Sequence, residues 1–474
     1  MKRSRIRLMS GIGVAALAGE LIFAAQAPVK SDPPAGPATL ITANEFGLSK
    51  TVLTDGAVFD LRNPFFKPLG TNGRSCVTCH APQDGWTISP FDVQVRFLLT
   101  GGRDPIFSSF DGTNSPNADR SSLKARYAAS TMLLNRGLIR VGIGIPANAE
   151  FTLANVDDPY GYASAAELSL FRRPMPTANL QFLTGVMWDG RESTPLTGTL
   201  PIGIATYSDA VNRSNLLADL AHQANDATRG HARADRDLTP AEAQAIVSFE
   251  LSIMAAQQTD FKVGALDIQG AEGGAHYLAD QPFYVSINDV LGADHYGNAF
   301  NPASMSLYHG WTNSHNAKRA QIARGEALFN SKPINIINVA GLNDDLNAPV
   351  IHGTCTTCHD TPNIGHHSVA LPINIGLTDA SRRTPDMPLY TLRNNSTGET
   401  TQTTDPGRAL ITGKWKDIGK FKGPVLRNLA SRAPYFHNGL ATDLNEAVDF
   451  YDTRFNIGFT SHEKADLVAF LKTL

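Results

Sequence analysis

Cysteine is scarce in this 474-residue chain, which has only four, all confined to two short stretches. Exported proteins normally use cysteine in disulfides, and such clustering does not indicate a disulfide framework. Charge is also sparse: 18% of the residues are charged, and the formal net charge is −3. This balance argues against nucleic-acid binding, which usually shows as a basic patch.

Long apolar runs are absent except at the N-terminus. The basic stretch "MKRSRIR" precedes the largely apolar "LMSGIGVAALAGELIFAA", and "AQA" at 25–27 has the small-x-small form of a cleavage site. This order predicts a signal peptide over residues 1–27. Glu20 inside the apolar run disfavours a membrane span. An uncleaved anchor and a cytosolic protein are the alternatives; we expect export and no stable membrane insertion after cleavage.

The cysteines form two Cys-x-x-Cys-His units, at 76–80 and 355–359. A thioredoxin-like dithiol would accompany a βαβ pattern, which neither unit has. A zinc site needs four closed ligands at shorter spacing than these distant pairs offer. Haem c fits both units, because two thiols bind the porphyrin vinyl groups and the histidine ligates the iron. We therefore predict two covalently bound haems c, held by Cys76, Cys79, His80, Cys355, Cys358 and His359.

The order of the motifs indicates that the chain contains two comparable units. Each begins with a haem stretch and closes with an amphipathic helix that starts in a capping box, Thr239 with Glu242 and Thr460 with Glu463. We predict an N-terminal haem domain over 28–257 and a C-terminal haem domain over 321–474. Residues 258–320 are rich in Gly, Asn, Asp and His without periodicity, so we expect an ordered loop insertion that packs against the domains.

Three phrases carry a family resemblance: "MWDGRES" from Met187, "GPVLRNLASRAPYFHNG" from Gly423 and "DLNEAVDFYDTRF" from Asp443. Together they resemble the bacterial dihaem cytochrome c peroxidase and MauG superfamily, from about Phe59 to the C-terminus, with the insertion outside the common core. The resemblance implies a periplasmic, mostly α protein with long ordered loops. Two cytochrome c-like haem domains would pack with their haems near the domain junction.

Function follows from the same resemblance as an expectation. Hydrogen peroxide would be cleaved at the N-terminal haem, with electrons from a small periplasmic cytochrome c or cupredoxin. The C-terminal haem would store or relay an oxidising equivalent. Two alternatives stay open: a MauG-like oxidase that modifies a protein or organic substrate, and a dihaem electron carrier without catalysis.

Trp188 of the "MWDGR" phrase aligns with the tryptophan that lies between the two haems in relatives. An indole there would offer a stepping stone for an electron. The alternative is a core aromatic, which most tryptophans are. Asp189 and Arg191 would orient the turn or pair with a haem propionate.

The loop after Trp188 departs from the family pattern. Relatives use a glutamine and a glutamate there to move a proton during peroxide cleavage, but this chain has neither from Ser193 to His222. Gln223 is the nearest glutamine, and His231 is the best substitute for the carboxylate, ahead of Asp226. Solvated polar residues are the alternative for all three.

The far ligand of the second haem is a methionine in peroxidases of the family and a tyrosine in MauG-like members. Its position, counted from His437 of "PYFH", falls on Tyr451. A phenolate would lower the reduction potential relative to a thioether. The alternative is a core tyrosine on a helix face shared with Leu444 and Val448. The predicted metal ligands are thus His80, His359 and Tyr451.

Calcium at the domain junction is a further family feature. Its asparagine ligand falls on Pro174 in this chain, and proline has no side-chain oxygen to offer. Calcium is therefore uncertain here. Arg173 and Arg432, near the same junction, are candidates to supply positive charge instead.

Overall fold

A computed structural model describes residues 38–194, 209–292 and 294–474. The predicted signal peptide at 1–27 lies outside these residues. So does the stretch 195–208, which holds much of the loop that lacks glutamine and glutamate. No helix of the described part combines the length and the apolar character that a membrane crossing requires.

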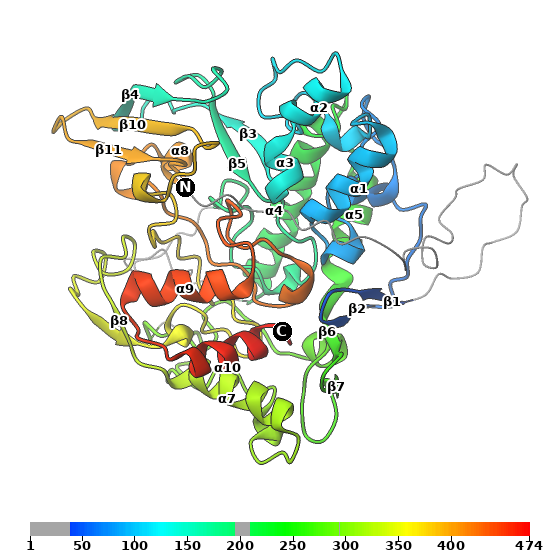
Figure 1. Cartoon of the computed structure of the whole chain (residues 1–474), viewed down its shortest axis with the longest axis vertical. Helices are drawn as coiled ribbons and strands as arrows, with labels where there is room; N and C mark the ends of the chain where they lie inside the picture. The colour runs from blue at the N-terminus through cyan, green and yellow to red at the C-terminus, as the bar shows by residue number, and fades with distance from the viewer. Residues whose placement is uncertain (1–37, 195–208, 293) are drawn as a thin grey trace, which may run out of the picture. The chain divides into compact units, whose positions relative to one another are not determined.

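Helices account for much of the regular structure (Figure 1). Ten α-helices occur in the described residues: α1 (Pro90–Thr100), α2 (Leu123–Ala129), α3 (Thr131–Arg136), α4 (Asp209–Gly230), α5 (Pro240–Ser252), α6 (Ala275–Ala279), α7 (Ala317–Ser331), α8 (Ala409–Thr412), α9 (Leu444–Phe455) and α10 (Ser461–Leu471).

Strands form four small sheets in the described part. The strand orders are β1-β2-β6-β7, β11-β10-β4, β3-β5 and β8-β9. Their bounds are β1 (Thr39–Ala43), β2 (Gly47–Leu53), β3 (Ile139–Ile143), β4 (Phe151–Asp157), β5 (Leu168–Arg172), β6 (Ile253–Asp260), β7 (Gly264–Ala265), β8 (Ile334–Ile336), β9 (Ile351–Gly353), β10 (Leu389–Asn394) and β11 (Thr400–Thr403). A fold of many helices is present, but these sheets mean that the mostly α prediction holds only in part.

Both predicted capping boxes are present. Thr239 accepts a hydrogen bond from the backbone N–H of Glu242 at the start of α5, and Thr460 does the same for Glu463 at α10. Capping satisfies backbone N–H groups that have no partner inside the helix. The two closing helices were therefore predictable from local sequence alone.

α7 and α10 pack closely against each other in the C-terminal part (Figure 1). Gly325 makes this approach feasible, because a Cβ there would lie 2.0 Å from the carbonyl oxygen of Asp466. Leu307, Tyr308 and Trp311 of the 258–320 segment join the same buried core. That segment thus packs against α7 and α10 and contributes the short helix α6.

Contacts also cross the predicted domain boundaries. β4 of the N-terminal part pairs antiparallel with β10 of the C-terminal part, and the backbone N–H of Gln257 donates to the carbonyl of Leu474. The boundaries at 257/258 and 320/321 remain predictions.

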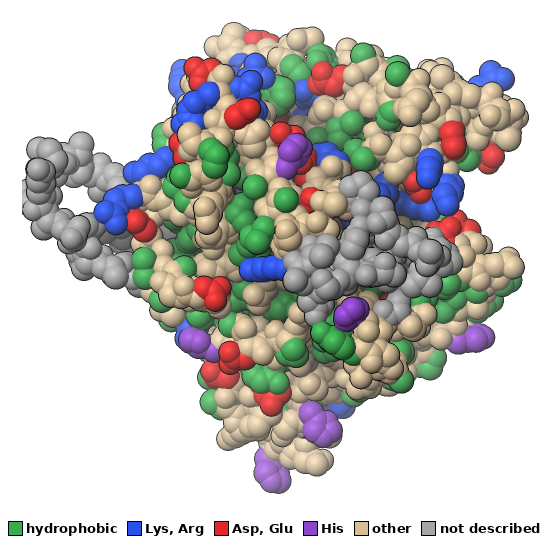
Figure 2. Space-filling view, turned by 180° about the vertical axis from the view of Figure 1, so that it is seen from behind, with side chains coloured by type: hydrophobic (Ala, Val, Ile, Leu, Met, Phe, Trp, Pro, Cys, Tyr) green, Lys and Arg blue, Asp and Glu red, His purple; other side chains and the backbone are tan. Residues whose placement is uncertain are grey.

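Figure 2 shows acidic and basic side chains interspersed over one face of the molecule.

A buried ion network fixes the turn that follows Trp188. Asp189 is fully buried, and its Oδ2 lies 2.5 Å from Nη1 of Arg172 and 3.1 Å from Nη1 of Arg191. Arg172 also binds Asp405 at 2.7 Å. These contacts orient the turn, and pairing of Arg191 with a haem propionate stays a prediction.

We expect Asp189→Asn to destabilise the protein by ~3–5 kcal/mol, because removing one partner of a buried pair leaves an uncompensated charge. Burial alone would raise the pKa of Asp189, but Arg172 and Arg191 lower it to about 2. The pair's stabilisation is therefore present above the ordinary aspartate pKa of ~4 and is lost as the pH falls towards 2. Urea unfolding of the wild type and of Asp189→Asn at several pH values measures this difference in the free energy of unfolding. The control is Asp60→Asn in the exposed pair with Arg62, for which little change is expected; equal losses in both variants would contradict it.

Candidate functional site

The two Cys-x-x-Cys-His units adopt the same local structure. Each forms a 3₁₀ turn, at Cys76–Thr78 and at Cys355–Thr357. In both, the threonine before the second cysteine accepts a hydrogen bond from the backbone N–H three residues earlier, at 3.0 Å. A repeated threonine thus holds both turns in one shape, which presents two thiols and a histidine together.

The two histidines are oriented by equivalent backbone carbonyls. Nδ1 of His80 lies 3.2 Å from the carbonyl oxygen of Trp86, and Nδ1 of His359 lies 2.7 Å from that of Gly365. A histidine that donates from Nδ1 presents Nε2 to a metal. Burial lowers the pKa of both, for His80 to about 4. Both imidazoles are therefore neutral at physiological pH, as a metal ligand must be.

All four cysteines are free thiols. Burial raises the pKa of each one, to about 12 for Cys355 and for Cys358. The thiols are therefore protonated at neutral pH. Each cysteine is half-buried and lines a cavity.

Each unit opens into a cavity with a largely apolar lining. The N-terminal cavity includes Cys76, Cys79, His80, Trp188, Gln223 and His231. The C-terminal cavity includes Cys355, Cys358, His359, Trp188, His437 and Tyr451. Gln223 and His231 thus line the cavity of the first Cys-x-x-Cys-His unit, Tyr451 lines that of the second, and Trp188 lines both.

The two cavities share part of their lining. The residues that contribute to both are Arg173, Pro174, Pro176, Trp188, Pro424 and Arg432. Nε1 of Trp188 donates to the carbonyl oxygen of Arg173 at 2.9 Å, which fixes the indole in this shared wall. The ring centroid of Trp188 lies 6.1 Å from that of His437.

Unpartnered polar atoms test whether these cavities fit haem. In the C-terminal cavity, the buried Nζ of Lys422 and Nε of Arg432 have no acceptor among the described residues. Burying a polar group without a partner is costly. These donors suit the carboxylates of a haem, whose apolar ring suits the remaining lining. The residues present therefore fit the cofactor.

The N-terminal cavity holds an unpartnered acid instead. Glu250 of α5 is buried, its Oε2 has no hydrogen-bond partner among the described residues, and burial raises its pKa to about 8. A neutral carboxyl in this position is a hydrogen-bond donor at pH 7. Sequence analysis missed Glu250, because its spacing in α5 resembles that of any buried helix face.

His231 follows α4 and is held by residues near the first haem unit. Its Nδ1 lies 2.5 Å from Oδ2 of Asp111, and Arg74 binds the other carboxylate oxygen at 2.5 Å. Burial alone would raise the pKa of Asp111, but His231 and Arg74 lower it below its usual value. Sequence analysis missed Asp111 and Arg74, since only the fold brings them to His231. Gln223 lines the same cavity from α4.

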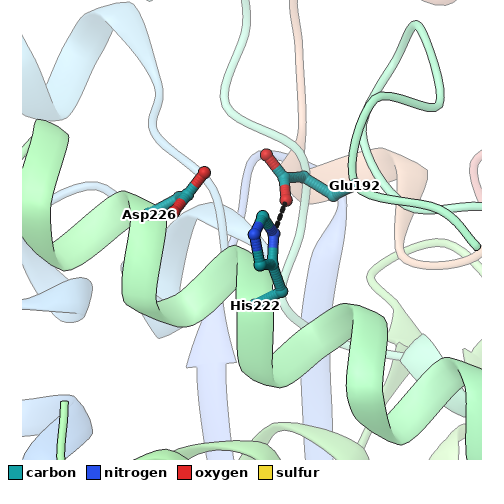
Figure 3. A group of neighbouring side chains, drawn as sticks. All are labelled: Glu192, His222 and Asp226. Carbon is teal, nitrogen blue, oxygen red and sulfur yellow. Dashed lines mark hydrogen bonds and ion pairs between the residues drawn. The ribbon is translucent and has the colours of Figure 1, made fainter. Parts of the chain in front are cut away.

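Asp226 belongs to a different group (Figure 3). His222 and Asp226 project from successive turns of α4 towards Glu192, and Nδ1 of His222 lies 2.6 Å from Oε2 of Glu192. This hydrogen bond raises the pKa of His222. Asp226 is exposed and is not among the residues that line the N-terminal cavity. Of the three loop candidates, only Gln223 and His231 reach the cavity.

Tyr451 lies on the face of α9 that lines the C-terminal cavity, together with Leu444, Ala447 and Val448. Burial raises the pKa of its phenol, and the nearby Cys358 and Cys355 thiols add to this shift. Met387, the only methionine after the second haem unit, packs instead with Met132, Leu138 and Phe171. The tyrosine therefore lines the same cavity as His359, and its ligation of the iron stays a prediction.

Comparison with known proteins gives partial similarities, and no family model matches the chain. "Cytochrome-c peroxidase IdrP1" of Pseudomonas sp. (strain SCT) is 31% identical over 179 residues, which are 34% of this chain and 41% of that protein. "Methylamine utilization protein MauG" of Paracoccus denitrificans (strain Pd 1222) is 34% identical over 90 residues, 19% of this chain and 20% of MauG. A MauG-like protein associated with microbial copper homeostasis aligns over 87% of each chain with 18% identity and a TM-score of 0.35.

The matched regions span less than half the length of these curated relatives. Their names are nevertheless those of cytochrome c peroxidases and MauG, so the superfamily resemblance predicted from the sequence motifs is confirmed.

Proposed function

We propose that this chain, which is similar to bacterial cytochrome c peroxidases and to MauG, is a periplasmic dihaem c peroxidase. It reduces hydrogen peroxide to water at the N-terminal haem and takes electrons from a small cytochrome c or cupredoxin. The observation that supports this most is the pairing of two similar Cys-x-x-Cys-His cavities that share Trp188 in their walls.

The residues that line the two cavities would have different roles. Bound haem supplies an iron that accepts peroxide and exchanges electrons. His80 and His359 would hold that group through Nε2, since Nδ1 of each is fixed by a backbone carbonyl. His231, held by Asp111, and Gln223 offer nitrogen and amide groups that bind peroxide or move its proton. Trp188 provides the aromatic bridge between the two cavities.

A second function is a MauG-like oxidase that modifies a protein or organic substrate. Tyr451 favours it, because this residue lines the C-terminal cavity at the position where MauG-like relatives carry their tyrosine ligand. Stopped-flow spectra with peroxide, followed by turnover with an artificial electron donor, separate the two. Fast steady-state loss of peroxide supports the peroxidase, and long-lived oxidised haems with negligible turnover support the oxidase. Haems that do not react with peroxide would leave an electron carrier and contradict both.

We expect His231→Ala to slow formation of the oxidised intermediate by ~10²-fold, because general acid–base groups contribute rate factors of that order. Single-turnover mixing with peroxide measures this rate. The matched control is His222→Ala, because His222 lies on α4, which directly precedes His231, but is exposed and does not line the cavity. An unchanged rate in His231→Ala would contradict this and would mean that His231 has only a structural role beside Asp111.

A further inference from the structure

Arg173 lies buried in the wall between the two cavities and contacts both. Its Nη1 donates to the carbonyl oxygen of Arg136 at 2.9 Å. Its Nη2 donates to the carbonyl oxygens of Ile88 at 2.7 Å and Arg432 at 3.2 Å. Three backbone carbonyls thus fix the guanidinium.

The fold leaves room for this guanidinium. Gly137 has a φ of +61°, and a Cβ there would lie only 2.6 Å from Nη1 of Arg173. A side chain at this position would therefore displace the guanidinium. The space is shaped for a planar cation that is held by carbonyl oxygens, which are also the groups that hold metal cations.

Arg432 forms the other half of the cationic wall. Its Nη2 donates to the carbonyl oxygen of Val425 at 2.8 Å, while its Nε is buried without a partner among the described residues. Its aliphatic stem packs over Gly85, where a Cβ would lie 2.7 Å from Cγ of Arg432. Both arginine side chains line both cavities.

Neither arginine has a carboxylate of the described chain within ion-pair distance, unlike Arg172, which pairs with two. Burial lowers the pKa of each to about 10, so both remain charged at neutral pH. Arg173 is buried and Arg432 is half-buried with a buried Nε, and positive charges in such places are costly unless an anion compensates them. The cavities that they line are those in which the two haems, each with two propionates, would lie.

We propose that Arg173 and Arg432 bind propionates of both haems and act as permanent cations between the two redox centres, without a metal ion. This inference rests on the proposed dihaem function. It assigns to the chain itself the positive charge at the junction, where Pro174 offers no side-chain ligand. A fixed positive charge favours the reduced iron by Coulomb attraction for the added electron, so both haems would have raised potentials.

Spectroelectrochemical titration of the haem-loaded protein tests this. Arg173→Met is expected to shift the reduction equilibrium of both haems at least tenfold towards the oxidised form, ~59 mV for one electron. Arg173→Lys should keep potentials close to those of the wild type. Arg136→Met is the matched control, because its side chain binds Thr384 and Asp386 and lines neither cavity. Neither EGTA nor added Ca²⁺ should alter the wild-type potentials.

Unchanged potentials in an Arg173→Met protein that carries two haems would overturn the proposal, as would a wild-type potential that falls with EGTA and recovers with Ca²⁺. If Arg173→Met does not load haem, Arg432→Met decides on the same criterion, since within the described part of the chain that side chain makes a single hydrogen bond. Failure of the dihaem function itself is distinguishable, because it appears in the wild type as fewer than two haems per chain.

Discussion

Peroxide reactivity is expected to fall by more than ~100-fold in His80→Ala, whereas the haem stays attached through Cys76 and Cys79. Even partners that only orient a metal-bound histidine are worth ~10–100-fold in affinity or activity, and His80 is the predicted ligand itself. The carbonyl of Trp86 places its imidazole in the N-terminal cavity. Stopped-flow absorption after mixing with peroxide measures the loss.

His359→Ala is the matched variant, because its imidazole is held in the same way by Gly365 in the C-terminal cavity. It should retain the first reaction with peroxide and lose storage of the oxidising equivalent. The reverse pattern, with a fast reaction in His80→Ala and none in His359→Ala, would assign peroxide cleavage to the C-terminal haem and contradict the division of roles.

The reduction potential of the C-terminal haem is expected to rise in Tyr451→Met by at least ~60 mV, about tenfold in the reduction equilibrium for one electron. A phenolate donates negative charge and stabilises the oxidised iron, whereas a thioether stabilises the reduced iron. Tyr451 belongs to α9 and lines the C-terminal cavity. Resonance Raman spectra should lose tyrosinate bands together with the change in potential.

Tyr435→Phe is the control for this substitution. Tyr435 lines the same cavity, but its hydroxyl donates to the carbonyl oxygen of Leu429 at 2.9 Å. Its removal should leave the tyrosinate bands intact. A methionine–iron charge-transfer band in the wild type would exclude Tyr451 as ligand, and so would tyrosinate bands that persist in Tyr451→Met.

Local sequence predicted the features that depend on neighbouring residues. The capping boxes at Thr239 and Thr460 start α5 and α10 as expected, because the hydrogen bonds of a helix start lie within four residues. The spacing of apolar residues also indicated the helix of Tyr451, and the resemblance indicated a place for Trp188 between the two haem sites, whose cavities it lines. The spacing of residues along the chain is enough to predict such features.

Features that depend on distant segments escaped sequence analysis. β4 and β10 pair across the molecule, yet β4 is mostly exposed and its alternation is weak, so it had no clear strand signal. Asp111 and Arg74 reach His231 only through the fold. Glu192, which binds His222, directly precedes the stretch searched for the missing carboxylate. A single sequence does not reveal such long-range partners.

Haem stoichiometry tests the central claim most directly. The full chain, expressed with haem-maturation machinery, should give two haems per chain in a pyridine haemochrome assay, and intact mass should show both attached covalently. The double substitution Cys76→Ser with Cys79→Ser should leave one haem, and Cys355→Ser with Cys358→Ser should leave the other. Fewer than two covalent haems in the wild-type chain would contradict the account.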